Sequence, residues 1–333
     1  MCWLRRLLLL SPVVILLVVY SYWNEGFLSS WTTREPSLPV SCPPYLCLCG
    51  RCDNRSNKSL LYHRLLHQPN GCFQGQQHSA IEGLLSDLGL VAVKSVPREV
   101  ELRDLVRKSW GRRLPQEYNI SVVFVLGVEE GMPQQEIDQE ARDKGDILQG
   151  AYPDSYERNS LKAMAMVHWW GVQLPASCST PLPPAFLPLD RDTLVLPAIL
   201  AAFLADPDWY SIQGECWSKR SKPFRKPESK WYISKRLWPQ PRYPHYCSGM
   251  GYVLPTEFVK RTAQLAWDPD WLTEFFNDDI VLTGVAADYL GIKRVCVDGG
   301  GIPSVVNLLP IQPLKSGRSG VGASANISCT TEN

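Results

Sequence analysis

The sequence has almost no excess of charge of either sign, because its 333 residues include 34 Lys and Arg against 33 Asp and Glu. Proteins that bind nucleic acid usually carry a basic excess or a basic face, so this balance argues against a nucleic-acid partner. Internal repeats are also missing. Hydrophobic residues make up 45% of the chain, which excludes a disordered or low-complexity protein and predicts a sizeable core.

Long hydrophobic runs are scarce as well, and only one approaches the length that a bilayer requires. It covers residues 7–23 and follows a short segment, residues 1–6, that contains two arginines. The bulky Tyr22 and Trp23 stand where a cleaved signal peptide has small residues, so an uncleaved anchor is favoured over a signal peptide. We therefore expect a cytoplasmic tail, a signal anchor and a lumenal remainder, in a single-pass type II arrangement.

Cysteine is abundant, and the eleven cysteines are accompanied by four Asn-x-Ser sequons. Both features are typical of the secretory pathway. With Cys2 on the cytoplasmic side, ten cysteines remain for disulfides. The spacing of Cys49 and Cys52 is also compatible with zinc, but no second matched pair accompanies it, so disulfides are favoured. The sequons predict glycosylation at Asn54, Asn57, Asn119 and Asn326.

Most of the chain alternates between strand and helix patterns. Strands are predicted at 122–127, 185–187, 252–254 and 294–297, and helices at 60–67, 134–144, 161–170 and 194–204. This alternation predicts a layered α/β domain. We assign 24–95 to a stem with a cysteine cluster, 96–315 to the α/β domain and 316–333 to a C-terminal tail. Residues 219–238 are basic and aromatic without a clear period, which predicts a long functional loop.

Two carboxylates follow the predicted strand at 185–187, in the sequence Asp190-Arg191-Asp192. Oxygen ligands at this spacing suit Mg²⁺ or Mn²⁺, which can bridge the phosphates of a nucleotide diphosphate. The pattern alone is weak, because such pairs are often solvated turn residues.

Two further motifs are compatible with either structural or chemical roles. Asp278 and Asp279 precede an apolar stretch, so they either cap a helix or provide a general base in a cleft. Tyr246 and Gly249 belong to a segment rich in Gly, Pro and Ser that predicts a tight turn close to a ligand.

The order of these motifs resembles the β-1,3-glycosyltransferases of glycosyltransferase family 31, the Golgi galactosyl- and N-acetylglucosaminyltransferases. The resemblance covers residues 96–306. It rests on Val106-Arg107-Lys108-Ser109-Trp110, the strand ending at Gly127, Gly145-Asp146-Ile147-Leu148, the stretch from Asp154 to Lys162, Trp169-Trp170 with Cys178, the acidic motif, Ser229-Lys230-Trp231-Tyr232-Ile233-Ser234, the stretch from Tyr243 to Tyr252, and Asp278-Asp279 with Gly284.

The resemblance implies a GT-A fold, a Rossmann-like sheet that binds a UDP-sugar with a divalent metal, usually Mn²⁺, and inverts the anomeric centre. It implies Asp279 as the catalytic base and Asp192 and Asp190 as metal ligands. The implied donor-binding residues are Arg107, Lys162, Asp190 and Arg191, and the implied donor or acceptor contacts are Lys230, Trp231, Tyr246, Gly249 and Asp278. The implied partners are a UDP-sugar, a glycan acceptor on protein or lipid and, through the anchor, the Golgi membrane.

Two positions depart from the family pattern. Arg191 replaces the middle acidic residue of the metal motif, and Pro188 replaces the lysine that usually stands two residues before it. The expected activity is transfer of a hexose, galactose by preference, to form a β-1,3 linkage. Transfer of N-acetylglucosamine and a non-catalytic lumenal role as partner of an active transferase remain alternatives. A hydrolase using Asp192 and Asp279 is disfavoured.

Overall fold

The computed structural model describes residues 45–46, 61–69, 88–177, 181–205, 210–216, 220–297 and 305–307. All of them belong to one unit of the chain, Cys42–Asn333. The predicted anchor, most of the predicted stem and the predicted tail lie outside these residues, as do Asn54, Asn57 and Asn326. Within the described ranges, no helix combines the length and apolar character that a membrane span needs.

A mixed sheet of eight strands runs through the described part of the chain. Its parallel centre consists of β4, β3, β2 and β5, flanked by antiparallel β1 and by antiparallel β8, with β7 and β9 beyond it. The strands, in sheet order, are β1 (Leu65–His67), β4 (Ile147–Pro153), β3 (Ile120–Val128), β2 (Gly89–Lys94), β5 (Ala185–Asp190), β8 (Cys247–Pro255), β7 (Ser211–Cys216) and β9 (Lys293–Cys296).

The strand order reverses between β2 and β5. From β2 the chain adds β3 and then β4 on one side, and it returns with β5 on the other side of β2. In sheets of this kind ligands bind outside the carboxyl ends of the strands at the reversal. Lys94 ends β2, Asp190 ends β5, and the two residues are partners in the parallel register. The fold therefore places the acidic motif at the position where a ligand is expected.

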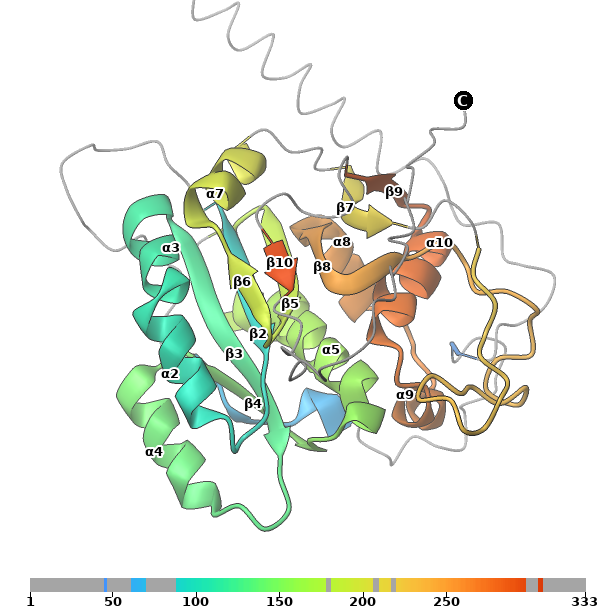
Figure 1. Ribbon diagram of the computed structural model, residues 1–333, viewed down its shortest axis with the longest axis horizontal. Coiled ribbons are helices and arrows are strands. Elements are labelled where there is room, and N and C mark those ends of the chain that lie inside the picture. Colours follow the sequence, from blue (N-terminus) through green and yellow to red (C-terminus); the bar gives the residue numbers. More distant parts are fainter. Residues whose placement is uncertain are drawn as a thin grey trace, which may run out of the picture. The chain divides into compact units, whose positions relative to one another are not determined.

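Helices cover both faces of this parallel centre (Figure 1). One face carries α2 (Val100–Lys108), α3 (Trp110–Tyr118), α4 (Gln134–Lys144) and α7 (Pro197–Ala205). Their apolar side chains form a core with those of the strands, in which Trp110, Phe124 and Leu187 are all buried. On the other side of the sheet, α5 (Asn159–His168) packs against α8 (Thr256–Ala263).

The remaining elements are short. A small two-stranded sheet pairs β6 (Thr193–Val195) with β10 (Val305–Asn307) in antiparallel register. The other helical segments are η2 (Leu61–His63), η3 (Tyr156–Arg158), the π-helical η4 (Trp169–Gln173), α6 (Leu174–Ser177), α9 (Pro269–Glu274), the π-helical η5 (Ile280–Ala286) and α10 (Ala287–Leu290).

The segment between β7 and β8 is a long loop, as the sequence predicts; its described part, 220–246, contains no helix or named strand. Arg225 holds it together by donating to the carbonyl oxygens of Ile233, Trp238 and Gln240 at 2.8, 2.6 and 3.1 Å. The ring of Trp238 is buried and packs against Phe275, with 5.7 Å between centroids. The loop is therefore an ordered part of the domain.

Most predicted elements are confirmed, and three differ. Strand β2 lies in the middle of the sheet although the sequence analysis assigned residues 24–95 to a stem, so the α/β domain begins before residue 96. The helix predicted at 60–67 is wrong, because residues 65–67 pair with the edge of the sheet as β1. The helix predicted at 194–204 begins only at Pro197, after β6.

Candidate active site

Lys94 joins two acidic motifs that are far apart in the sequence. Its Nζ atom lies 2.8 Å from Asp190 Oδ1 and 2.8 Å from Asp278 Oδ2, and the lysine and Asp278 are both buried. Burial alone would lower the pKa of Lys94, but the two carboxylates outweigh it and raise that pKa well above its ordinary value. The ammonium group is therefore a fixed positive charge between the acidic motif at Asp190 and the Asp278–Asp279 pair.

A pocket of about 300 Å³ opens at the carboxyl ends of β2 and β5. It is lined almost entirely by polar side chains, and four of its lining residues are cations. Its lining residues are Lys94, Ser95, Val96, Asp154, Ser155, Tyr156, Asn159, Lys162, Asp190, Arg191, Asp192 and Lys230. The structure thus brings five residues of the sequence prediction (Lys162, Asp190, Arg191, Asp192 and Lys230) into one cavity.

Lys162 lies deep in this pocket and is held from two sides. Its Nζ donates to Asp154 Oδ1 at 2.7 Å and to the carbonyl oxygen of Ser95 at 2.5 Å. The other carboxylate oxygen of Asp154 accepts a hydrogen bond from Gly127 N–H at 2.7 Å. Burial lowers the pKa of Lys162 despite the neighbouring carboxylate. Lys162 therefore fixes the segment after β2 as well as lining the pocket.

Arg191, the basic residue inside the acidic motif, turns toward the start of α2. Its Nε lies 3.2 Å from Glu99 Oε1, and its side chain is 47% exposed. Glu99 Oε2 is buried and has no hydrogen-bond partner among the described residues. Within the part of the chain that the structure describes, this ion pair is the one polar contact of Arg191, which also lines the pocket.

Asp279 begins the π-helical segment η5, and its Oδ1 accepts from the Ile280 N–H at 2.8 Å. Burial, followed by the neighbouring Asp278 charge, raises the pKa of Asp279 to about 7, against smaller opposing effects of that N–H and Lys94. A carboxylate with a pKa near neutrality accepts a proton readily and is suited to general-base work. Asp279 thus caps this helix and has a pKa in the range that suits a general base.

The turn at the start of β8 lies directly against Asp279. A Cβ added to Gly249 would lie 3.9 Å from Asp279 Oδ2, which is ordinary van der Waals distance, so the turn packs closely against the carboxylate. Burial raises the pKa of Tyr246, and Asp279 adds to that rise. Thr283 fixes the turn, because it accepts from Cys247 N–H at 2.9 Å and donates to Asp279 O at 2.6 Å.

Disulfides are present around this turn. Cys216 of β7 and Cys247 of β8 are bonded to each other, and Cys296 of β9 is also disulfide-bonded. The prediction that cysteines of the chain form disulfides is confirmed for these residues. Cys49 and Cys52 lie outside the described residues.

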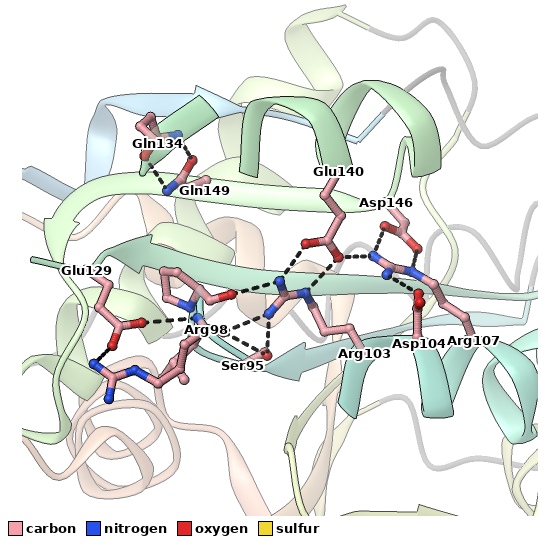
Figure 2. A network of polar contacts seen from close by, with 12 residues as sticks. Ser95, Arg98, Arg103, Asp104, Arg107, Glu129, Gln134, Glu140, Asp146 and Gln149 are labelled. Carbon is pink, nitrogen blue, oxygen red and sulfur yellow. Dashed lines mark hydrogen bonds and ion pairs between the residues drawn. The ribbon is translucent and has the colours of Figure 1, made fainter. Parts of the chain in front are cut away.

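Arg107 lies outside the pocket, contrary to the role that the resemblance implied. Its guanidinium group donates to both carboxylate oxygens of Asp146 at 2.8 Å and contacts Glu140 at 2.7 Å and Asp104 at 3.0 Å (Figure 2). It also lies over the Phe124 ring, 4.7 Å from the ring centroid. Every nitrogen of the group has a partner in the network between α2 and α4. We therefore leave Arg107 out of the candidate site.

The sequence analysis missed Lys94 and Arg103. Arg103 is almost completely buried and donates to the carbonyl oxygens of Val96 and Pro97, the Ser95 hydroxyl and both oxygens of Glu140 (Figure 2). It thereby holds the segment that carries the Lys162 contact. One sequence signal could have identified Lys94. It is a lysine at the end of an apolar run, and the carboxyl end of a buried parallel strand is where ligands bind.

Asp190 and Asp192 are the residues that would hold a divalent cation. Carboxylate oxygens suit Mg²⁺ and Mn²⁺, and both side chains reach the pocket, so the donor set fits an open site completed by ligand oxygens. Within the described ranges no group of three or more His, Cys, Asp or Glu is arranged around a metal position. Lys94 already occupies one oxygen of Asp190, which leaves Asp192 as the less constrained carboxylate.

The profile of the Galactosyltransferase family matches residues 101–298. The chain belongs to this family. The match contains both acidic motifs, the Lys230–Trp231 segment and the turn at Gly249. The resemblance to glycosyltransferase family 31 is therefore confirmed, and the matched region is a glycosyltransferase domain.

Curated relatives include enzymes of two donor classes. The chain is 30% identical over 63% of its length to UDP-GlcNAc:betaGal beta-1,3-N-acetylglucosaminyltransferase 7 of Rattus norvegicus, which it covers to 53%. It is 29% identical over 52% of its length to Beta-1,3-galactosyltransferase 2 of Mus musculus, which it covers to 41%. A human acetylgalactosaminyl-O-glycosyl-glycoprotein beta-1,3-N-acetylglucosaminyltransferase is 32% identical over 52% of the chain and is covered to 47%. The chain spans about half the length of these relatives.

Among solved structures, the galactosyltransferase LgtC in complex with donor and acceptor sugar analogs matches with a TM-score of 0.34 at 12% identity, covering 62% of this chain and 73% of that one. A likeness at this level carries no argument about the site.

Proposed function

We propose that the protein is an inverting, metal-dependent glycosyltransferase with a GT-A fold that moves a hexose from a UDP-sugar to an acceptor hydroxyl and forms a β-1,3 linkage. The observation that carries the proposal is the bridge through Lys94, which joins Asp190 of the metal motif to Asp278 beside the base. A transferase must bring the leaving diphosphate and the attacking hydroxyl to opposite sides of one carbon. The bridge supports this arrangement, because it couples a candidate diphosphate site to a candidate base.

In the proposed reaction Asp279 accepts the proton of the acceptor hydroxyl. The hydroxyl oxygen forms a bond to the anomeric carbon, the bond from that carbon to the diphosphate oxygen breaks, and UDP leaves with the electron pair. Asp279 is suited to this task because its pKa of about 7 makes the ionised carboxylate a useful base at neutral pH.

At the donor end, Asp192 and Asp190 would hold the divalent cation, and Arg191, Lys162 and Lys230 add positive charge to the pocket walls. When bound, the metal offsets the negative charge that develops on the departing UDP. Arg191 is exposed and tethered by one contact, so we assign it to the diphosphate. Replacing it by Asp should weaken UDP binding measured by calorimetry without metal, whereas the exposed Arg113→Asp should not.

A donor screen tests the function. We expect transfer from UDP-galactose or UDP-N-acetylglucosamine to a β-galactoside in the presence of Mn²⁺, with galactose the first donor to try. The identities of 28 to 32% to relatives of both classes do not separate the two donors. Asp279→Asn should abolish transfer but leave UDP binding intact. Full activity of that variant would remove Asp279 from the role of base.

A non-catalytic role is the second candidate, and the observation that favours it is the cation inside the metal motif. Arg191 is paired with Glu99 and Lys94 occupies Asp190, so both lower the negative charge available for a metal. The two candidates differ in Mn²⁺-dependent hydrolysis of the UDP-sugar without acceptor. A transferase releases UDP slowly in this assay, and a non-catalytic partner releases none.

We further propose a Golgi location in which residues 7–23 anchor the chain and the domain is lumenal. The apolar run, the disulfides near β8 and the sequons support this. Of the sequons only Asn119 is described; it is partly buried, in a left-handed conformation after α3. Protease protection in intact microsomes tests the topology, and digestion with an endoglycosidase tests the glycosylation.

A further inference from the structure

Four aromatic side chains form a continuous row that begins beside the proposed base. Phe276 precedes Asp278 by two residues, and its ring centroid lies 5.4 Å from that of Tyr156. The Lys230 ammonium group lies over both the Tyr156 ring and the Trp231 ring and so links them. The Phe224 ring follows, with its centroid 5.5 Å from Trp231. We call these four residues the aromatic row.

The aromatic row becomes more exposed with distance from Asp278. Tyr156 is 39% exposed, Trp231 49% and Phe224 53%. Single exposed rings are ordinary on protein surfaces, whereas contiguous ones mark binding sites. These rings come from three separate segments of the chain, so their contact is a product of the fold and not of sequence proximity alone.

The outer end of the aromatic row is held in place by the loop that carries it. The Phe224 carbonyl accepts from Ile233 N–H at 2.9 Å, and Phe224 and Tyr232 form a β-bridge. Arg225, next to Phe224, donates to three loop carbonyls. Lys230 Nζ lies 4.4 Å from the Tyr156 ring centroid and 5.9 Å from that of Trp231. A surface fixed in this way loses little conformational entropy when it binds a ligand.

The position of the row relative to the pocket indicates what it binds. Tyr156 and Lys230 line the pocket, whereas Trp231 and Phe224 are absent from its lining. The donor end of the site is rich in cations that suit a diphosphate, but the outer rings offer apolar faces. A pyranose ring has a face of C–H bonds that stacks on the electron-rich face of an aromatic ring. Neutral sugar units therefore match the outer row better than the anionic donor does.

We propose that the aromatic row is an acceptor subsite that binds the sugar units behind the one that receives the transferred sugar. This inference rests on the proposed function, because it takes the acceptor hydroxyl to lie at Asp279. A glycan whose reacting end lies there reaches Phe276 and Tyr156 first and continues over Trp231 and Phe224. The preferred acceptor is then an oligosaccharide, not a single sugar.

The test compares two acceptors that both end in β-galactose: methyl β-galactoside and the tetrasaccharide lacto-N-neotetraose. The full-length chain is assayed with whichever of the two UDP-sugars supports transfer. We expect Phe224→Ala to raise the KM of the tetrasaccharide about 3- to 10-fold, as the loss of one stacking contact implies. The KM of the monosaccharide, the kcat values and the affinity for UDP should not change.

Two variants of Trp231 and one control variant accompany this measurement. Trp231→Phe keeps an aromatic face and should retain most of the preference for the tetrasaccharide, whereas Trp231→Ala should lose it. Tyr210→Ala is the matched control, because Tyr210 is 51% exposed but precedes β7 at the end away from the Cys216–Cys247 disulfide; it should change nothing.

Equal KM changes for both acceptors, a raised donor KM, or no change in Phe224→Ala would each overturn the proposal. Binding is also measured without chemistry, by saturation-transfer NMR of the tetrasaccharide on the wild type and on Phe224→Ala. If the wild type transfers to neither acceptor, the proposed function fails. The NMR difference then still decides whether the row binds sugar: a weaker signal in the variant supports it, and equal signals refute it.

Discussion

Two clusters of charged side chains lie on either side of the segment after β2, and they are built differently. In the cluster of Figure 2, Arg103 and Arg107 place every guanidinium nitrogen on a carboxylate, a carbonyl or a hydroxyl group. In the pocket, Arg191 has one contact and is half exposed. A saturated network fixes the backbone, whereas an unsaturated one keeps binding capacity for a ligand. The comparison separates structural charges from those available to a substrate.

Lys94 combines the two properties, because its ammonium group is paired with two carboxylates and also lines the pocket. Replacing it should therefore have the largest effect on activity. Lys94→Met leaves the carboxylates of Asp190 and Asp278 close together without their shared cation. We expect kcat/KM to fall about 100- to 5000-fold, since unpairing a buried charge costs about 3–5 kcal/mol. Lys260→Met, which removes a surface lysine 3.8 Å from Glu257, is the control and should stay near wild type. Comparable loss in both would remove the special role of Lys94.

Arg103→Gln tests whether the saturated cluster acts on the pocket through the backbone. It removes the contacts to Val96, Pro97 and Glu140, so we expect about 3 kcal/mol lower stability in urea unfolding and a raised donor KM with little change in kcat. Arg113→Gln breaks the exposed pair with Glu117 and should leave the stability close to that of the wild type. A stability loss without any KM change would confine Arg103 to a purely structural role.

The pH profile of kcat/KM tests the ionisation of Asp279, the proposed base. The raised pKa of Asp279, about 7, predicts that activity falls about tenfold per pH unit below it, because the protonated acid accepts no proton. Burial and the Asp278 charge cause the rise, so Asp278→Asn should move this acidic limb to lower pH. A limb that stays in place would assign the ionisation to another group.

The smallest effect, on stability and not on activity, is expected at two stacked histidine rings that lie outside both charged clusters. His63 and His168 stack with 4.0 Å between centroids, and burial followed by His63 lowers the pKa of His168 to about 4. An unfolded histidine binds its proton near pH 6.5, so stability is retained above that pH and decreases as pH falls from 6.5 toward 4. Both residues are partly exposed to solvent, so we expect a loss of about 1 kcal/mol or less. Unfolding of His168→Phe should lack this pH dependence; if it kept it, another group would be responsible.

The sequence predicted best the elements that depend on local signals. Helix α4 has its predicted bounds, because Gly145 adopts the left-handed conformation after its last turn. The helix predicted at 60–67 failed because pairing with β4 overrides local periodicity. Five of the predicted residues line the pocket, as the order of the family motifs implies. Arg107 lies outside the pocket because its guanidinium group is held by Asp146, Glu140 and Asp104. The Lys94 bridge needs the register of two strands about 95 residues apart in the chain, which no local pattern contains.

The register of β2 against β5 also restricts which insertions and deletions the domain tolerates. Side chains alternate across a strand, so a shift by one residue would exchange Lys94 for Val93 or Ser95 opposite Asp190. Length changes in the long loop or in the connections between helices leave that alignment untouched. A single inserted residue within β2 would move the ammonium group away from both carboxylates, and one within β5 would move Asp190 away from it. Assembly of the site thus depends on an alignment completed during folding, before any ligand binds.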